Sequence, residues 1–167
     1  MQKLFDIVNT NDQVIGIKTA AECHADPQLI HRVVHFTLFD PKTKKFLIAQ
    51  RSFEVKFDSG IWCFMGEHVL SGESYESTLK KGIADELGIT SDFSFVETAH
   101  NIFTYATQTE FVRFFVVNWN GEAIQINKTE IIDYKWISLK ELLAEKNTYS
   151  KMTQYWIENT NWRVSLM

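Results

Sequence analysis

Residues that interrupt a folded core are scarce in this sequence. Two of the 167 residues are proline and seven are glycine, whereas 45% are hydrophobic and 14% are aromatic. This composition excludes a disordered chain and is typical of a globular protein. The length suits one domain with its own hydrophobic core better than two domains, so we expect a single domain over residues 1–167.

Cysteine and long apolar runs are scarce as well. Cys23 and Cys63 are the only cysteines. They lie far apart and lack the spacing of metal ligands, so we expect buried thiols in a reducing compartment. Residues 1–8 show no signal peptide, and no apolar run approaches the about 20 residues that cross a bilayer. These absences predict a cytoplasmic protein without a membrane partner.

Positive charge is in deficit. The 17 lysines and arginines face 21 aspartates and glutamates, for a net charge of −4. This balance argues against a nucleic-acid polymer as the partner, because such partners are bound through an excess of basic residues. Single basic side chains can still meet the phosphates of a small molecule. The sequence does not determine the oligomeric state, and a homodimer is one of the states that it allows.

The clearest pattern is an amphipathic helix that follows Ser74. Apolar residues recur every four positions at Tyr75, Leu79, Ile83 and Leu87. This period predicts a helix of about four turns with one buried face. Ser74 is suited to the N-cap, and Gly88 is suited to the left-handed conformation that ends a helix.

Two adjacent acids follow near the end of this helix. Asp85 and Glu86 lie on a different face from the first apolar residues, and Gly82 is one turn earlier on the acidic face, so we expect both carboxylates to converge on one spot. Adjacent carboxylates repel unless a cation lies between them, and a hard divalent ion such as Mg²⁺ prefers oxygen ligands. The glycine-bearing loop 66–72, followed by Glu73, favours such a site over a solvated acidic helix end.

The stretch 66–89 resembles the Nudix box, whose pattern is G, five residues, E, seven residues, R-E-U-x-E-E-x-G-U, with U an aliphatic residue. The positions in register are Glu73, Ile83, Asp85, Glu86, Gly88 and Ile89. Lys81 replaces the arginine, and Gly66 matches a glycine whose carbonyl binds a metal in many members. The resemblance implies that Glu86 and Asp85, helped by Gly66, bind Mg²⁺ or Mn²⁺. It also implies that Glu73 orients the helix through Lys81.

Two positions depart from the box. Glu67 stands where the box begins with glycine, and Gly82 stands where the family has a glutamate that is often a metal ligand and sometimes the general base. Glycine performs neither role and costs about 1 kcal/mol of helix propensity relative to alanine. Another acid, Glu67 or Glu110, would have to replace the missing base.

Strand patterns surround the helix. Residues 5–8 and 14–17 predict an N-terminal β-hairpin, and residues 32–39 and 46–51 predict an antiparallel pair. Further strands are expected at 60–65, 93–107, 110–118 and 131–137, and further helices after Ser138 and at 149–159. Residues 19–30 predict a short helix or loop, and residues 52–59 a loop. Together they predict an α/β protein with a mixed sheet sandwiched between helices, which agrees with the Nudix fold that the resemblance implies.

Histidines form a second constellation. The spacing of His24, His31 and His68 is similar to that of type I isopentenyl diphosphate isomerase, a Nudix-fold family in which three histidines and glutamates bind a divalent metal. The resemblance implies further roles at four positions. Glu110 matches a glutamate ligand, Arg51 and Lys56 match residues that meet the diphosphate, and Tyr105 matches an aromatic residue that lines the site. Singly, each histidine would be read as a surface or hydrogen-bonded residue.

The catalytic cysteine of that isomerase family has no counterpart. Gly66 occupies its place, and Cys63 lies three residues too early. Without a positioned thiol, protonation of an alkene carbon has no obvious acid. The sequence therefore favours a metal-dependent hydrolase that cleaves a diphosphate linkage in a nucleoside diphosphate derivative or related small molecule. The alternatives are an isomerase-like enzyme and a binding module that has lost catalysis.

Overall fold

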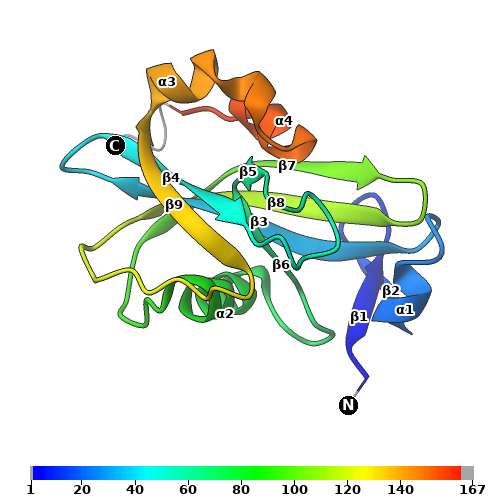
Figure 1. The fold of residues 1–167 in the computed structure, drawn as a ribbon. Helices are drawn as coiled ribbons and strands as arrows, with labels where there is room; N and C mark the ends of the chain where they lie inside the picture. The colour runs from blue at the N-terminus through cyan, green and yellow to red at the C-terminus, as the bar shows by residue number, and fades with distance from the viewer. Residues whose placement is uncertain (1, 163–167) are drawn as a thin grey trace.

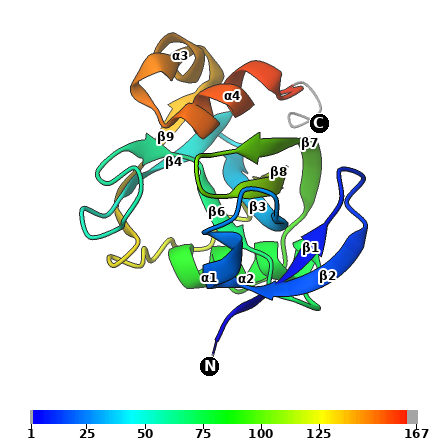
Figure 2. The ribbon, with the colours of Figure 1, turned by 90° about the vertical axis from the view of Figure 1, so that its right-hand side faces the viewer.

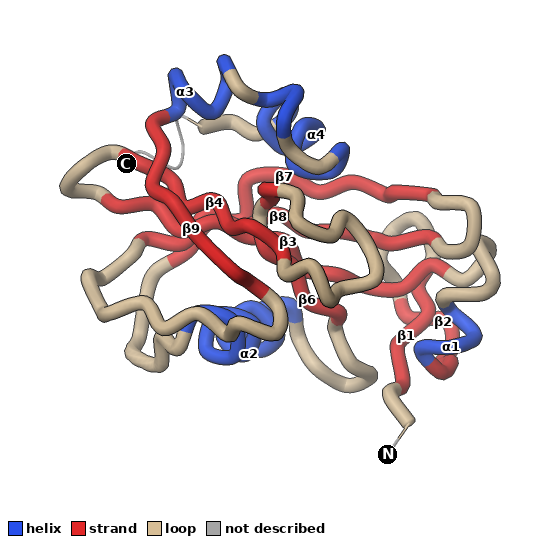
Figure 3. Tube along the Cα trace, viewed as in Figure 1, coloured by secondary structure: helices blue, strands red, loops and turns tan. Residues whose placement is uncertain are grey.

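A mixed β-sheet forms the middle layer of the protein, with helix α2 on one side and helices α3 and α4 on the other (Figures 1 and 3). The computed structural model describes residues 2–162. The strands are β1 (Leu4–Val8), β2 (Val14–Thr19), β3 (Ile30–Asp40), β4 (Lys45–Arg51), β5 (Trp62–Cys63), β6 (Met65–His68), β7 (Phe95–Thr104), β8 (Thr109–Asn118) and β9 (Ile131–Ser138). The helices are α1 (Ala20–Cys23), α2 (Tyr75–Leu87), α3 (Leu139–Ala144) and α4 (Lys151–Asn159), with a 3₁₀ turn at Lys146–Thr148. This architecture confirms the predicted α/β/α sandwich and its N-terminal hairpin.

Strand β3 is the centre of the sheet. It runs parallel to β8 over almost its whole length and antiparallel to β6 from Val33 to Phe36. The predicted antiparallel pair of β3 with β4 forms only at the β3 residues Phe39 and Asp40. The pairing is this short because β6 occupies the same edge of β3 further back. Strand β4 instead pairs along its length with β9.

Alternating side chains give each face of the sheet its own hydrophobic core. On β3, Val33 points toward α4, whereas Val34 and Phe36 point toward α2. The core on the α4 side is rich in aromatic residues and includes Phe46, Phe64, Phe114, Trp156 and Trp162. The core on the α2 side includes Leu38, Leu47, Met65, Val69, Leu79, Ile83 and Leu87. The same alternation separates the polar residues of β6 onto opposite faces.

Helix α2 begins and ends where the sequence predicts. The Ser74 hydroxyl accepts a hydrogen bond from the N–H of Ser77 at 3.0 Å, and Gly88 closes the helix with a φ of 69°. The predicted apolar positions Leu79, Ile83 and Leu87 are fully buried against the sheet. Both ends are fixed by local chemistry, since N-caps and left-handed glycines act within one turn of the helix.

Several predicted elements differ from the observed ones in their bounds, and for two of them a hydrogen bond or a cap explains the difference. The strand expected at 60–65 is divided into β5 and β6, because the N–H of Phe64 donates to the hydroxyl of Thr153 on α4 at 2.9 Å rather than to a neighbouring strand. The helix expected at 149–159 begins at Lys151, because Ser150 is its N-cap. None of the helices within residues 2–162 has the length and apolar character of a membrane span.

The turn of the β1–β2 hairpin is held by Asp12. Its carboxylate accepts hydrogen bonds from Arg32 Nε at 2.7 Å, from an Arg113 nitrogen at 2.6 Å and from the Tyr75 hydroxyl at 3.0 Å. The residue has a φ of 61°, a conformation that aspartate and asparagine tolerate better than most. The hairpin is therefore fastened to β3, β8 and α2 at one buried carboxylate.

Replacing Asp12 by asparagine is expected to lower the free energy of unfolding by about 2 kcal/mol, because charged hydrogen bonds to both arginines are lost while the turn conformation is kept. Urea unfolding followed by circular dichroism measures the change. The control is Asn11→Ala in the same turn, where the side chain is exposed. An equal, small effect of both substitutions would contradict the role of Asp12.

Candidate active site

Glu86 is influenced by the charges of two other acids, Glu67 and Glu130. Glu86 is in the last turn of α2, Glu67 is on β6, and Glu130 directly precedes β9. Burial, followed by the charges of Glu67 and Glu130, raises the pKa of Glu86 to about 8, whereas Arg51 acts in the opposite direction. No side chain or backbone N–H within residues 2–162 donates a hydrogen bond to the Glu86 carboxylate. The cluster therefore carries an excess of negative charge that a cation would relieve.

Asp85 points away from this cluster, and among the acids its charge raises the pKa of Glu86 least. Its side chain is 58% exposed, and Lys81 lies 3.5 Å from its carboxylate. Successive helical residues point about 100° apart, so Glu86 faces the sheet while Asp85 faces outward and pairs with the lysine one turn earlier. The expected convergence of the two carboxylates on one spot is wrong.

Glu73 is placed at the start of α2, but not by the predicted contact. Its carboxylate accepts hydrogen bonds from the hydroxyl of Thr78 at 3.0 Å and from the N–H of Leu70 at 3.4 Å. Lys81 is engaged with Asp85 instead. Glu73 therefore joins the loop before the helix to the helix itself through Thr78, and the expected link through Lys81 is wrong.

The three predicted histidines come together on the other face of β6. His24 caps the C-terminal end of α1, His31 is on β3 and His68 is on β6, and one ligand atom from each lies within 4.8 Å of the others. Figure 2 shows α1 and the hairpin beside the β6 end of the sheet. The ring of Phe5 stacks on His68 at 5.1 Å with an interplanar angle of 2°. Within residues 2–162 this is the only such group of potential ligands.

The chemistry of these histidines fits a metal ion. Both ring nitrogens of His31 and the Nε2 of His68 are buried without a hydrogen-bond partner. Burial, followed by the neighbouring histidines, lowers the pKa of His31 to about 4 and that of His68 to about 3. The imidazoles are therefore neutral at pH 7, which is the form that binds a metal. Buried polar atoms without a partner are costly, and a cation would satisfy them.

Glu110 supplies a carboxylate beside the histidines. It lies next to His31 in the parallel register of β3 and β8, and its Oε1 is 3.8 Å from His68 Nε2. It accepts a hydrogen bond from Gln108 at 2.7 Å. Burial raises the pKa of Glu110 to about 7, and the phenol of Tyr105 opposes this increase. Tyr105 therefore lies at the same site, with 40% of its surface exposed.

Basic residues approach from the end of β4 and the loop that follows it. Arg51 Nε donates to the carbonyl of Phe57 at 3.0 Å, and its charge lowers the pKa of Glu86. Lys56 is exposed over the ring of Phe57, and its charge lowers the pKa of His24. Arg51 thus brings a positive charge to the acids and Lys56 brings one to the histidines, and their contact with a diphosphate stays a prediction.

Gly66 lies on β6 opposite His35, directly before Glu67 and His68. A Cβ at this position would lie 2.6 Å from the His35 ring, which is held by a hydrogen bond from Trp156 Nε1 at 3.1 Å. A side chain at position 66 therefore has no room. Cys63, the cysteine three residues before Gly66, does not supply a thiol either. It is buried, and burial raises its pKa to about 12, which leaves it unreactive.

Replacing Gly66 by alanine is expected to lower the free energy of unfolding by about 2 kcal/mol, because the added methyl group displaces a packed ring. Thermal and urea unfolding measure the loss. Gly16→Ala is the matched control, since a Cβ there meets nothing within 4 Å. If both variants are as stable as the wild type, the His35 ring is free to move and the steric restriction is wrong.

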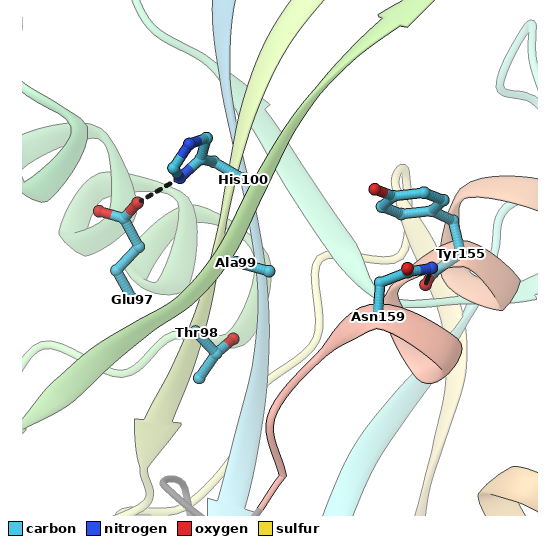
Figure 4. A pocket seen from close by; sticks show the side chains of 6 residues that line it. All are labelled: Glu97, Thr98, Ala99, His100, Tyr155 and Asn159. Atoms are coloured by element: carbon cyan, nitrogen blue, oxygen red, sulfur yellow. Dashed lines mark hydrogen bonds and ion pairs between the residues drawn. The ribbon is translucent and has the colours of Figure 1, made fainter.

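A separate hollow of about 420 Å³ lies between β7 and α4 (Figure 4). It is lined by Tyr155 and Asn159 on α4 and by residues 97–100 of β7, where His100 Nδ1 lies 3.4 Å from a carboxylate oxygen of Glu97. The hollow is open, and none of the acids or histidines described above lines it. The active-site assignment therefore rests on the two clusters at β6.

Glu130 is the member of the acidic cluster that sequence reasoning missed. It is separated from Glu86 by 44 positions (130 − 86) in a chain segment without a recognisable motif. Its position directly before a predicted strand was the one available signal. The pairing of β9 with β4, which places Glu130 beside Ser52, could not be read from the sequence.

Comparisons with known proteins identify the family and the fold. The family model described as NUDIX domain matches residues 29–156. The chain is 27% identical to isopentenyl-diphosphate Delta-isomerase 2 of Photorhabdus laumondii, over 95% of this chain and 90% of that protein. It is 25% identical to an uncharacterized Nudix hydrolase of Nostoc sp., over 87% of this chain and 86% of that protein. The crystal structure of DR0079 from Deinococcus radiodurans superposes with a TM-score of 0.78 at 20% identity, covering 95% of this chain and 99% of that one.

Proposed function

The chain belongs to the Nudix family, and from this premise we propose that it is a divalent-cation-dependent hydrolase that cleaves a diphosphate linkage in a nucleoside diphosphate derivative or related small molecule. The observation that carries the proposal is the partly buried Glu86, which has Glu67 and Glu130 nearby and only Arg51 to balance them. Such a group of carboxylates matches the preference of Mg²⁺ and Mn²⁺ for oxygen ligands.

A cation bound at Glu86 would neutralise diphosphate charge and make water a stronger nucleophile. Arg51 and Lys56 would bind the phosphate oxygens from the loop side. Glu130 is exposed beside Glu86 and would accept the proton of the attacking water. A P–O bond forms from the water oxygen, the bridging P–O bond breaks, and the leaving phosphate departs with the former bridging oxygen.

The histidine cluster supports a second cation. His24, His31, His68 and Glu110 would hold it, and the unpartnered nitrogens of His31 and His68 are the reason. These ligands also hold α1 and β1 against the end of the sheet, since Phe5 on β1 stacks on His31 and His68. The second cation would thus fix one wall of the site.

An isomerase-like activity is the second candidate, because the same histidines and the Photorhabdus relative favour it. The space beside Gly66 opposes it. His35 fills the place where a side-chain thiol would have to lie, and Cys63 is buried with a raised pKa. A binding module without catalysis is the third candidate, and Gly82 is its support. Hydrolysis is preferred because the acids around Glu86 are retained together with Arg51.

The experiment that separates these candidates is product analysis. The protein is incubated with a panel of nucleoside diphosphate derivatives and isopentenyl diphosphate, with Mg²⁺ or Mn²⁺ and, in parallel, with EDTA. Metal-dependent release of phosphate, measured directly or after phosphatase treatment, is the expected result. Isomerised product without phosphate release would favour the second candidate. Metal-dependent binding without any turnover would favour the third.

A further inference from the structure

Gly82 and Glu67 face each other across the contact between α2 and β6. A Cβ added to Gly82 would lie 3.3 Å from the Cβ of Glu67 and 3.4 Å from the ring of Phe36. This distance is tighter than ordinary van der Waals contact, so the absence of a side chain at position 82 gives the Glu67 side chain its room. The two positions therefore share one space.

The direction of the Glu67 side chain follows from the alternation along β6. Met65 and Val69 pack against α2, so Glu67, between them, points to the same face. His68 is on the opposite face with the histidine cluster. Consistent with this direction, the charge of Glu67 is the largest electrostatic influence that raises the pKa of Glu86.

Glu67 has no cationic partner among residues 2–162. Its one side-chain hydrogen bond in this part of the chain is from the neighbouring N–H of His68, at 3.2 Å. Glu86, whose pKa the charge of Glu67 raises, has no side-chain hydrogen bond within residues 2–162. Two carboxylates on packed elements, with no side-chain donor and no basic residue bound to either in this part of the chain, are suited to share a cation rather than to form a stabilising contact.

We propose that Glu67 supplies, from strand β6, the cation-binding carboxylate that helix α2 lacks at Gly82. The inference rests on the hydrolase function proposed above and adds a residue to its cation site. Since a Cβ at position 82 would lie only 3.3 Å from the Cβ of Glu67, a carboxylate carried by either backbone would reach the same cation. The exchange of glycine and glutamate between the two positions therefore preserves the site.

The test is the binding of Mg²⁺ alone, measured by isothermal titration calorimetry. This ion is chosen because it prefers oxygen ligands to imidazole. Glu67→Gln is expected to weaken binding on the order of 10-fold or more. Glu67→Gly should do the same, whereas the double variant Glu67→Gly/Gly82→Glu should bind Mg²⁺ nearly as well as the wild type. Glu76→Gln removes an exposed carboxylate of α2 and is the matched control.

Two results would overturn the inference. One is unchanged Mg²⁺ affinity in Glu67→Gln, whose fold is checked by circular dichroism. The other is a double variant that binds no better than Glu67→Gly. Glu86→Gln separates the two proposals, since it should lose Mg²⁺ whichever residue is its partner. If Glu86→Gln loses the ion and Glu67→Gln keeps it, only the role of Glu67 is wrong; if both keep it, the cation site itself is wrong.

Discussion

Replacing Trp156 by alanine is expected to lower the free energy of unfolding by about 4 kcal/mol, the range found when a fully buried aromatic side chain is deleted. Trp156 has no exposed surface, and its ring stacks on Phe114 at 5.2 Å with an interplanar angle of 8°. Phe103 contacts it edge-on at 5.4 Å. The substitution would leave a large cavity between α4 and the sheet. The packed rings of Phe114 and Phe103 would not fill it.

The same substitution also acts on the candidate active site. Trp156 Nε1 donates to His35 Nδ1, and the His35 ring lies against Gly66 on β6. Trp156→Phe keeps most of the packing but removes this donor, so it is the matched variant and should cost less than the alanine substitution. Circular dichroism in urea is the suitable measurement, since fluorescence changes when a tryptophan is removed. A loss below about 1 kcal/mol for Trp156→Ala would show that α4 adds little to the core.

Zn²⁺ is expected to stabilise the wild-type protein through the histidine cluster. An ion at about 100 times its dissociation constant adds about 2.7 kcal/mol to the free energy of unfolding. For a chain of this length such a gain raises the melting temperature by about 5–10 °C. His31→Ala should abolish most of the increase, because His31 supplies a buried nitrogen that no other residue in 2–162 satisfies.

The control for this experiment is His100→Ala. His100 is the histidine of β7, with 62% of its side chain exposed, and it lies near Glu97 rather than near the cluster. It should keep the full Zn²⁺ response. An equal response in the wild type and in His31→Ala, or equal losses in both variants, would show that the ion binds elsewhere.

The parts of the fold that the sequence predicts are those governed by local chemistry. The ends of α2 follow from Ser74 and Gly88, and the capping box of α3 follows from Ser138 and Glu141, because each cap acts within a few residues. The hairpin β1–β2 is also local. The parallel pairing of β3 with β8 joins His31 to Glu110, which no short-range pattern encodes.

The candidate site divides in the same way. The spacing of His24, His31 and His68 along the chain was enough to predict that they lie together, but only because a known family has the same spacing. The outward direction of Asp85 and the contact of Glu73 with Thr78 depend on how α2 is rotated against the sheet. That rotation is set by Leu79, Ile83 and Leu87 in the core, which place Glu86 rather than Asp85 toward β6.

The most direct measurement is the rate of phosphate release by Glu86→Gln, compared with the wild type and with Glu76→Gln at saturating Mg²⁺. Glutamine keeps the size of the side chain and removes only the charge. A fall of at least about 100-fold in Glu86→Gln alone is the predicted result, because a cation at Glu86 supplies several kcal/mol of transition-state stabilisation. Metal-dependent release at the wild-type rate in Glu86→Gln would contradict the assignment of the catalytic cation to the acids between α2 and β6.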